Sequence, residues 1–393
     1  MLSSKYPGTS WNAAALLEKA ATLIDEGKIS DAQDAYKHLA REYPDRPETR
    51  KGLLGLAQSF RAQGKTTQAI DSYSNIITRW PSSEEALLAH EDLSSIHAAE
   101  GSLQQYAAWL NGIQGAPRIS GDEMERLEYR AAADAFAADV NNLALLEDYV
   151  KRYPEGENIA AALYDLADGR LEAHNYKGAL QAVDLLLMRR PDSPQADAAL
   201  LIRGEILENH SDSADARAKA FDAYSRLESK GNPAYSTDAL CGMMRTAPSA
   251  EKQVTLADKV LRAGGSSDQM EEASFYKAEG LLKEGRDKEA LSILTTLSGH
   301  PAGIYGAKAA VALGQYRFDH KDYAAAEKVL SEFADSGTPH EYWLARGFIL
   351  LADVYSARGK KYLAKEYLES LKTNYPGDEA DIREMITRRL SKL

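Results

Sequence analysis

Several residue types are scarce in this chain, and each scarcity excludes a class of protein. One cysteine, Cys241, occurs in 393 residues, which excludes an internal disulfide framework and a zinc site built from cysteines. The net charge of −12 argues against a nucleic-acid groove, because such a groove needs a basic face. No apolar run approaches the roughly 18 residues of a membrane-spanning helix. The 13 prolines concentrate between periodic segments, as expected of an all-helical chain.

The N-terminal sequence, MLSSKYPGTSWNAAALL, contains neither an apolar h-region nor a lipobox cysteine, so no signal peptide is visible. The first periodic helix begins about a dozen residues after Met1, and no polar capping helix covers its remaining apolar faces. We therefore expect this chain to be the C-terminal part of a longer repeat protein. If the N-terminus is truncated in this way, we expect a periplasmic or envelope protein, and otherwise a cytoplasmic one.

A two-helix pattern is clearest between residues 345 and 376. Its positions are Phe348, Leu351, Ala352 and Tyr355 on a first helix, Gly359 in a turn, Ala364 and Leu368 on a second helix, and Pro376 after it. Large residues in this pattern fill the space between the paired helices, and small ones allow close approach. These offsets are those of the tetratricopeptide pattern.

The same pattern recurs along the chain in about ten units, some of them degenerate. Tyr36 and Tyr73 are 37 residues apart, as are Pro44 and Pro81, slightly more than the common repeat of about 34 residues. Residues 378–393 predict a last amphipathic helix that covers the apolar end of the array. Its apolar side consists of Ile382, Met385, Ile386, Leu390 and Leu393.

These observations predict an all-α fold, a right-handed superhelix (α-solenoid) of about ten tetratricopeptide-like hairpins with a C-terminal capping helix. We divide the chain into N-terminal units at 1–112, degenerate middle units at 113–263, and C-terminal units with the capping helix at 264–393. The glycine-rich segment 111–123, NGIQGAPRISGDE, is the best candidate joint. A single continuous solenoid is the alternative to this division.

The helix-pair pattern resembles the tetratricopeptide repeat superfamily. The junctions EYPDR, RWPSS, RYPEG and NYPGD look like those of a bacterial subset, and the chain resembles the C-terminal region of large envelope proteins of Gram-negative bacteria. The resemblance implies a non-enzymatic scaffold that binds a protein partner, has no cofactor, and takes part in envelope assembly. It gives no identity for the partner.

The resemblance also implies that the first helices of the hairpins line a concave groove. The residues that would face a partner there are Lys51, Gln58, Arg61, Tyr164, Asp168, Glu205, Glu208, Phe275, Glu279, Lys308, Gln315, Arg346 and Asp353. This mixture of apolar, acidic and basic groups suits an extended segment or a helix of another protein. The same mixture also occurs on any solvated helix face. The clustered Lys/Asn/Arg set with which chaperone-binding relatives clamp a C-terminal carboxylate is not seen.

The sequence shows no catalytic or metal-binding constellation. Gly64-Lys65-Thr66 looks like the end of a phosphate-binding loop, but Ser59 stands where that loop needs a glycine, and a helix precedes it instead of a strand. We interpret these residues as an inter-helix turn. Of the eight histidines, only two share a helix face, and they lie about 10 Å apart along the axis, too far for one metal ion.

The remaining polar and aromatic features have structural explanations. We expect the paired acids Glu84-Glu85 and Glu271-Glu272 to lie in first helical turns, where they favour the helix dipole. Cys241 lies in an apolar helical run and is expected to be buried. We expect core or junction packing for the four tryptophans, Trp11, Trp80, Trp109 and Trp343.

Two functions therefore stay open. The first is the protein-binding scaffold. The alternative is the helical accessory region of a peptidoglycan-acting or glycan-binding system. The alternative should bring a compact non-repeat domain with a catalytic glutamate, or a long insertion with exposed aromatic residues. Repeats occupy nearly all of this chain, which favours the scaffold.

Overall fold

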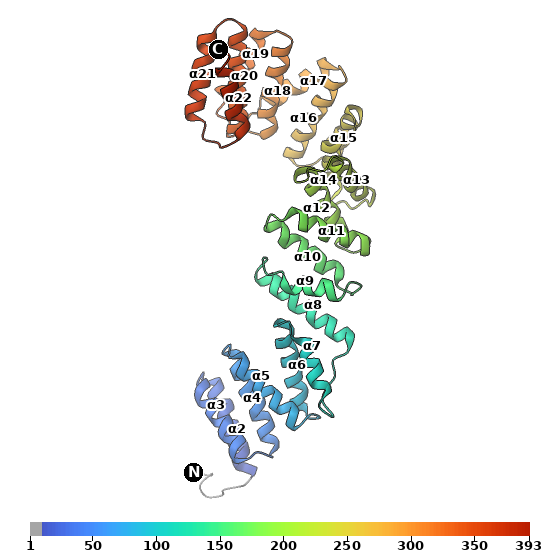
Figure 1. Cartoon of the computed structure of the whole chain (residues 1–393), viewed down its shortest axis with the longest axis vertical. Helices are drawn as coiled ribbons and strands as arrows, with labels where there is room; N and C mark the ends of the chain where they lie inside the picture. Colours follow the sequence, from blue (N-terminus) through green and yellow to red (C-terminus); the bar gives the residue numbers. More distant parts are fainter. Residues whose placement is uncertain (1–9) are drawn as a thin grey trace. The chain divides into compact units, whose positions relative to one another are not determined.

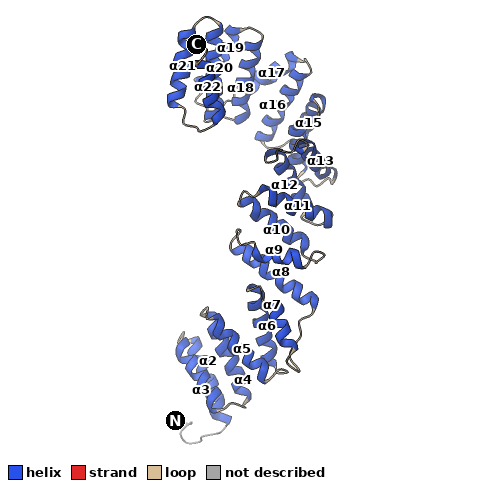
Figure 2. Ribbon diagram, viewed as in Figure 1, coloured by secondary structure: helices blue, strands red, loops and turns tan. Residues whose placement is uncertain are grey.

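The computed structural model describes residues 10–393, and all regular secondary structure in that part of the chain is helical (Figures 1 and 2). The helices form two compact units, Met1–Ser193 and Pro194–Leu393. The predictions for the first nine residues, on a signal peptide and on a capping helix, lie outside the described residues. The three-part division of the chain stays a prediction.

The first unit consists of five helix hairpins. Its helices are α2 (Ser10–Asp25), α3 (Ile29–Glu42), α4 (Pro47–Ala62), α5 (Thr66–Arg79), α6 (Glu84–Ala99), α7 (Leu103–Asn111), α8 (Gly121–Ala138), α9 (Ala144–Arg152), α10 (Ile159–Glu172) and α11 (Tyr176–Arg189). The first helix of each hairpin packs against the first helix of the next one. We call the surface formed by these even-numbered helices the first-helix face.

The second unit has the same construction and ends in a single helix. Its helices are α12 (Ala196–Asn209), α13 (Ala216–Ser229), α14 (Ser236–Thr246), α15 (Ala250–Ala263), α16 (Ser267–Lys283), α17 (Asp287–Ser298), α18 (Ile304–Asp319), α19 (Tyr323–Ala334), α20 (Glu341–Ala357), α21 (Lys361–Asn374) and α22 (Ala380–Leu390). The predicted helix hairpins, five in each unit of the described chain, and the last helix are confirmed.

In most of the described hairpins the turn contains one residue with positive φ. Gly64 adopts φ +68°, and the next amide, that of Lys65, donates to the Phe60 carbonyl over 2.9 Å. This bond satisfies a carbonyl at the end of α4 that has no partner within the helix. The interpretation of Gly64-Lys65-Thr66 as an inter-helix turn is thus confirmed. At the same turn position the hairpins of α10 and α18 use His174 and Lys321, with φ of 55° and 59°.

The segment between α7 and α8, which the sequence singles out as a joint, is packed against the first unit. Ala116 is buried, and Ile113 and Ile119 contact the same apolar core. The Arg118 guanidinium donates to the Leu110 carbonyl over 2.8 Å. Helices α6 and α8 also contact each other directly, so the hairpin stack continues past this segment.

Helix α22 covers the end of the last hairpin, as predicted. Ile382 and Ile386 are buried, and Met385, Leu390 and Leu393 pack against the same core at partial exposure. The Arg389 guanidinium also forms an ion pair with the Asp353 carboxylate, in which Nε lies 2.8 Å from each carboxylate oxygen. The capping role of the C-terminal helix is confirmed, and it includes a charged contact to α20 as well as apolar burial.

Close helix packing in the second unit centres on Tyr224 of α13. This side chain is fully buried, and it lies against glycines of two first helices, Gly204 of α12 and Gly242 of α14. A Cβ atom added to either glycine would lie 2.5 Å from Tyr224 Cε1. The absence of side chains at these two positions therefore allows three helices to meet around one aromatic ring.

Cys241 of α14 is buried, at 2% exposure, as predicted. Burial, reinforced by the nearby Glu272 carboxylate, raises the pKa of its thiol to about 12. No helix among the described residues is long and apolar enough to cross a membrane. The same residues contain no group of three His, Cys, Asp or Glu side chains placed to hold a metal ion.

Replacing Gly204 or Gly242 with alanine is expected to lower the free energy of unfolding by roughly 1–2 kcal/mol. The cost of overpacking, about 1–3 kcal/mol, exceeds the gain in helix propensity of up to about 1 kcal/mol. Chemical denaturation measures the change. Gly121→Ala is the control, because an added Cβ at this helical position meets nothing within 4 Å. Equal effects at all three glycines would contradict this account of the packing.

The Cys241 thiol should make stability depend on pH. The unfolded thiol ionises near pH 8.5, whereas the folded thiol has a pKa of about 12. Between these values only the unfolded state gains from ionisation, so the free energy of unfolding should fall by up to about 1.4 kcal/mol per pH unit. Denaturation of wild type and Cys241→Ala between about pH 8 and 10, below the ordinary range of tyrosine, measures this. Parallel pH curves for the two proteins would contradict the prediction.

Candidate functional site

A partly buried ion-pair network joins three first helices of the second unit. These helices, α12, α14 and α16, are labelled in Figure 1. The Arg245 guanidinium donates to Glu208 through Nε over 2.7 Å and to Glu272 through Nη1 over 3.2 Å. The Tyr224 hydroxyl donates to the other Glu208 oxygen over 2.8 Å. Burial alone would lower the pKa of Arg245, but the hydrogen bond and charge of Glu208, with the charge of Glu272, raise it. The network therefore keeps Arg245 charged and connects three consecutive hairpins.

The position of Glu272 corrects one prediction. Helix α16 begins at Ser267 behind the N-cap Ser266, whose side chain and that of Gln269 form a capping box. Glu271 and Glu272 therefore lie in the second turn, not in the first. Glu272 is buried at 7% exposure, and its role is to pair with Arg245. The prediction for Glu84-Glu85 is confirmed, since α6 begins at Glu84.

Aromatic rings continue the first-helix face from α16 to α18. The Phe275 and Tyr276 rings lie 5.8 Å apart, and each faces Tyr305 of α18, at 5.9 and 6.5 Å respectively. Burial raises the pKa of Tyr276 and of Tyr305, and Glu272 adds to both effects. These hydroxyls therefore stay protonated and can donate hydrogen bonds.

Lys308 of α18 extends its ammonium group over three of the rings on this face. Nζ lies 4.7 Å from the Tyr305 centroid, 5.7 Å from Trp343 and 6.0 Å from Phe275. Among the residues that the structure describes, no carboxylate comes within ion-pair distance of this ammonium. Burial lowers the pKa of Lys308, while Glu272 and Glu279 act in the opposite direction. Lys308 is thus a partly desolvated cation that is held by aromatic faces.

Arg346 of α20 is a second cation that lies next to aromatic rings on this face. Its guanidinium lies 5.9 Å from both the Trp343 and Tyr342 rings and donates to the Tyr342 hydroxyl over 3.1 Å. That hydroxyl in turn donates to Asp381 of α22 over 2.8 Å. We call Phe275, Tyr305, Lys308, Trp343 and Arg346 the aromatic–cation cluster.

The structure brings together three of the residues that the sequence predicted to face a groove. Lys308 lies near the Phe275 ring, and Lys308 and Arg346 both lie near the Trp343 ring of the aromatic–cation cluster. Two others have their carboxylates engaged within the chain, since Glu208 binds Arg245 and Asp353 binds Arg389.

The other predicted residues are distributed over both units. In the first unit, Arg61 pairs with Asp92 of α6, and Lys51 and Gln58 are exposed on α4. Tyr164 and Asp168 are half-buried on α10, Glu205 is exposed on α12, Glu279 is half-buried on α16, and Gln315 donates to Asp319 of its own helix over 2.8 Å.

Sequence reasoning missed Arg245, Tyr305 and Trp343 as members of this surface. Arg245 belongs to the atypical seventh unit, and Trp343 was assigned to packing alone. One signal could have revealed the charged contacts. Arg245 and Glu208 are 37 residues apart, and Arg389 and Asp353 are 36 apart, so opposite charges about one repeat period apart meet on neighbouring first helices.

Comparisons with known proteins identify the type of repeat in this chain. One profile of the tetratricopeptide repeat matches residues 17–84, 54–118 and 164–231, and a second matches residues 348–378. Together the matches span about half of the chain. The chain belongs to the tetratricopeptide repeat family. No curated protein sequence matches it.

Solved structures that are similar to this repeat protein include a tetratricopeptide repeat protein from Parabacteroides merdae ATCC 43184. The sequence identity is 12%, the match covers 97% of this chain and 100% of that one, and the TM-score is 0.31. Yeast Tom70 is also similar, at 11% identity, 97% and 95% coverage and a TM-score of 0.36.

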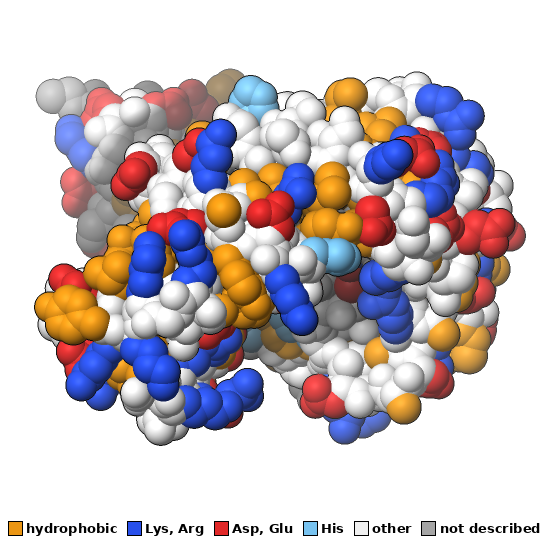
Figure 3. Space-filling view, turned by 90° about the horizontal axis from the view of Figure 1, so that it is seen from above, with side chains coloured by type: hydrophobic (Ala, Val, Ile, Leu, Met, Phe, Trp, Pro, Cys, Tyr) orange, Lys and Arg blue, Asp and Glu red, His pale blue; other side chains and the backbone are white. Residues whose placement is uncertain are grey.

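A surface of one charge sign is absent from the face drawn in Figure 3. Lysine and arginine side chains alternate there with acidic and apolar ones over short distances. Such a surface favours local contacts over long-range attraction of a highly charged ligand.

Replacing Arg245 with methionine should destabilise the second unit by about 3–5 kcal/mol, because it leaves two partly buried carboxylates unpaired. Arg245→Met combined with Glu208→Gln and Glu272→Gln should recover most of that loss. Chemical denaturation provides the measurement. Arg286→Met is the matched control, since Arg286 pairs with Glu289 at an exposed site and should matter little. A loss at Arg245 no larger than at Arg286 would contradict the role given to the network.

Proposed function

We propose that this tetratricopeptide repeat protein is a non-enzymatic scaffold that binds a segment of a partner protein on the first-helix face of its second unit. The aromatic–cation cluster forms the centre of that site. The partner segment carries an acidic side chain between apolar ones. The observation that carries the proposal is the Lys308 ammonium, which lies over three aromatic rings without a carboxylate partner in the described chain.

The residue types of the cluster support binding to a protein. Tryptophan, tyrosine and arginine are the residues most enriched among those that dominate binding energy in protein interfaces. Trp343, Tyr305 and Tyr342 are all partly exposed, so apolar ring surface is available next to the charges. Their rigid rings also lose little conformational entropy when a partner binds.

The charges of the cluster determine which part of a partner fits. Lys308 and Arg346 both lie near the Trp343 ring, at 5.7 and 5.9 Å from its centroid, and Arg346 also lies 4.0 Å from Asp381. An acidic side chain placed between them gains charge-assisted hydrogen bonds. A basic side chain at the same place meets two like charges and is rejected.

We further propose that this scaffold works in the bacterial envelope. The support is the likeness of the junctions EYPDR, RWPSS, RYPEG and NYPGD to those of envelope repeat proteins. Fractionation of the source cells, with an antibody against this chain, tests the compartment. Recovery with a cytosolic marker would overturn the envelope proposal and leave the binding site untouched.

Lys308→Met and Arg346→Met should each weaken partner binding about tenfold, because each removes one charge and keeps most of the apolar stem. The partner is first captured from source cells on immobilised wild-type chain and identified. Its affinity for purified wild type and variants is then measured by calorimetry. Lys288→Met on α17 is the matched control, since Lys288 is exposed on a second helix. This control should bind as wild type does.

Two outcomes would overturn the proposed site. One is equal affinity of all three variants for the partner, with melting temperatures that show them to be folded. The other is binding of muropeptides or other oligosaccharides by the purified chain that competes with the partner. The second outcome would favour the accessory region of a glycan-binding system.

A further inference from the structure

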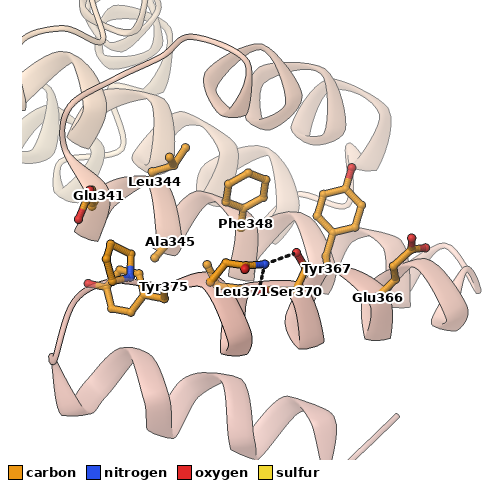
Figure 4. A pocket seen from close by; sticks show the side chains of 11 residues that line it. Glu341, Leu344, Ala345, Phe348, Glu366, Tyr367, Ser370, Leu371 and Tyr375 are labelled. Carbon is orange, nitrogen blue, oxygen red and sulfur yellow. Dashed lines mark hydrogen bonds between the residues drawn. The ribbon is translucent and has the colours of Figure 1, made fainter.

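The last hairpin carries a separate apolar pocket of about 600 Å³ between α20 and α21. Its base is formed by Leu344, Ala345 and Phe348 of α20, and by Tyr367 and Leu371 of α21 (Figure 4). This volume is in the usual range for ligand sites in proteins. The five side chains are buried or half-buried, so the pocket is apolar and still open to an incoming group.

This pocket lies on a different side of α20 from the aromatic–cation cluster. At 3.6 residues per turn, Leu344 and Phe348 occupy nearly the same angular position, whereas Arg346 and Asp353 lie together on roughly the opposite side. An occupant of the pocket therefore does not contact Lys308 or Arg346. The two surfaces can be tested independently.

Two unpaired carboxylates mark the ends of the pocket. Figure 4 shows Glu341 near Tyr375 at one end and Glu366 next to Tyr367 at the other. Tyr375, the C-cap of α21, follows Glu366 by nine positions, so these ends are about 13 Å apart along the helix axis. Neither carboxylate makes an ion pair in the described part of the chain, and no basic residue lines the pocket.

Other polar groups of the pocket are satisfied by the chain itself. Asn374 Nδ2 donates to the Ser370 carbonyl over 2.9 Å and to Ser370 Oγ over 3.3 Å. The Tyr375 hydroxyl donates to Glu379 over 2.5 Å. Burial, the Glu379 bond and the charges of Asp381 and Glu341 raise the Tyr375 pKa. The end of the pocket near Tyr375 therefore carries several negative charges.

We propose that this pocket docks an amphipathic helical segment of another protein, with apolar side chains between two basic ones about 13 Å apart. The apolar row enters the space over Phe348 and Leu371, and the basic residues pair with Glu341 and Glu366. This is the helix-in-groove mode of recognition. The inference is independent of the site proposed at Lys308 and adds a second docking surface to the scaffold.

The test uses the full chain and a synthetic peptide with a fluorescent label. The probe is a helical peptide of about 16 residues with leucines at i, i+3, i+4 and i+7, and with lysines placed about 13 Å apart on either side. A second peptide has glutamates in place of the lysines. Fluorescence anisotropy measures both peptides against wild type, Glu341→Lys, Glu366→Lys and the double variant.

The lysine peptide should bind wild type at least about tenfold more tightly than the glutamate peptide. Each single variant should weaken the lysine peptide, and the double variant should reverse the preference. Glu369→Lys is the matched control, because Glu369 lies on α21, pairs with Lys365 and does not line the pocket. This control should bind within about twofold of wild type.

Three results would overturn the inference. The first is no binding of the lysine peptide to wild type, and the second is equal losses in Glu366→Lys and Glu369→Lys. The third is a change of sedimentation coefficient in the double variant alone, which would assign the pocket to a second copy of this chain. Lys308→Met should leave peptide binding unchanged, so the outcome here is distinguishable from failure of the site at the aromatic–cation cluster.

Discussion

The fold depends on contacts in which a glycine of a first helix accepts a large side chain of a second helix. In the first unit, a Cβ on Gly55 would lie 2.7 Å from the Tyr36 hydroxyl. In the second unit, a Cβ on Gly314 would lie 2.6 Å from Leu330 Cδ2, and Tyr224 meets two glycines in this way. Each contact sets the distance between helix axes. Since the spacing repeats, the first helices within each unit come close enough to contact one another.

This constraint explains how much of the fold was predictable. Small and large residues must alternate at fixed offsets wherever two helices meet, so the pattern is visible in a single sequence. The tetratricopeptide profiles match only part of the chain, and none of their matches covers α14 to α19. The hairpins nevertheless continue there. The pattern constrains a few core positions per repeat, and Ala278, Gly314 and Leu330 still satisfy it.

The candidate site was less predictable, because its contacts join different repeats. Phe275, Lys308 and Trp343 come from three helices, and nothing local in the sequence links them. Glu272 was placed in a first turn because the capping box at Ser266 starts α16 earlier than expected. In the second turn, Glu272 pairs with Arg245 of the neighbouring first helix. Helix ends are the least certain part of a sequence prediction, and the site is sensitive to them.

Ion pairs between neighbouring even-numbered helices engage some of the residues that the sequence predicted to face a partner. Glu208 and Asp353 already form ion pairs with arginines of neighbouring even-numbered helices, so their carboxylates are not available to pair with a partner protein. Among the described residues, Lys308 has no such counterion. The free-energy cost of its partial desolvation is already included in the free energy of folding. At about 4 Å an ion pair contributes about 1 kcal/mol in water and about 4 kcal/mol at an effective dielectric constant of 20. A carboxylate that reaches Lys308 among its rings therefore gains more than one that reaches an exposed lysine such as Lys51, and this difference supports the site proposed at the aromatic–cation cluster.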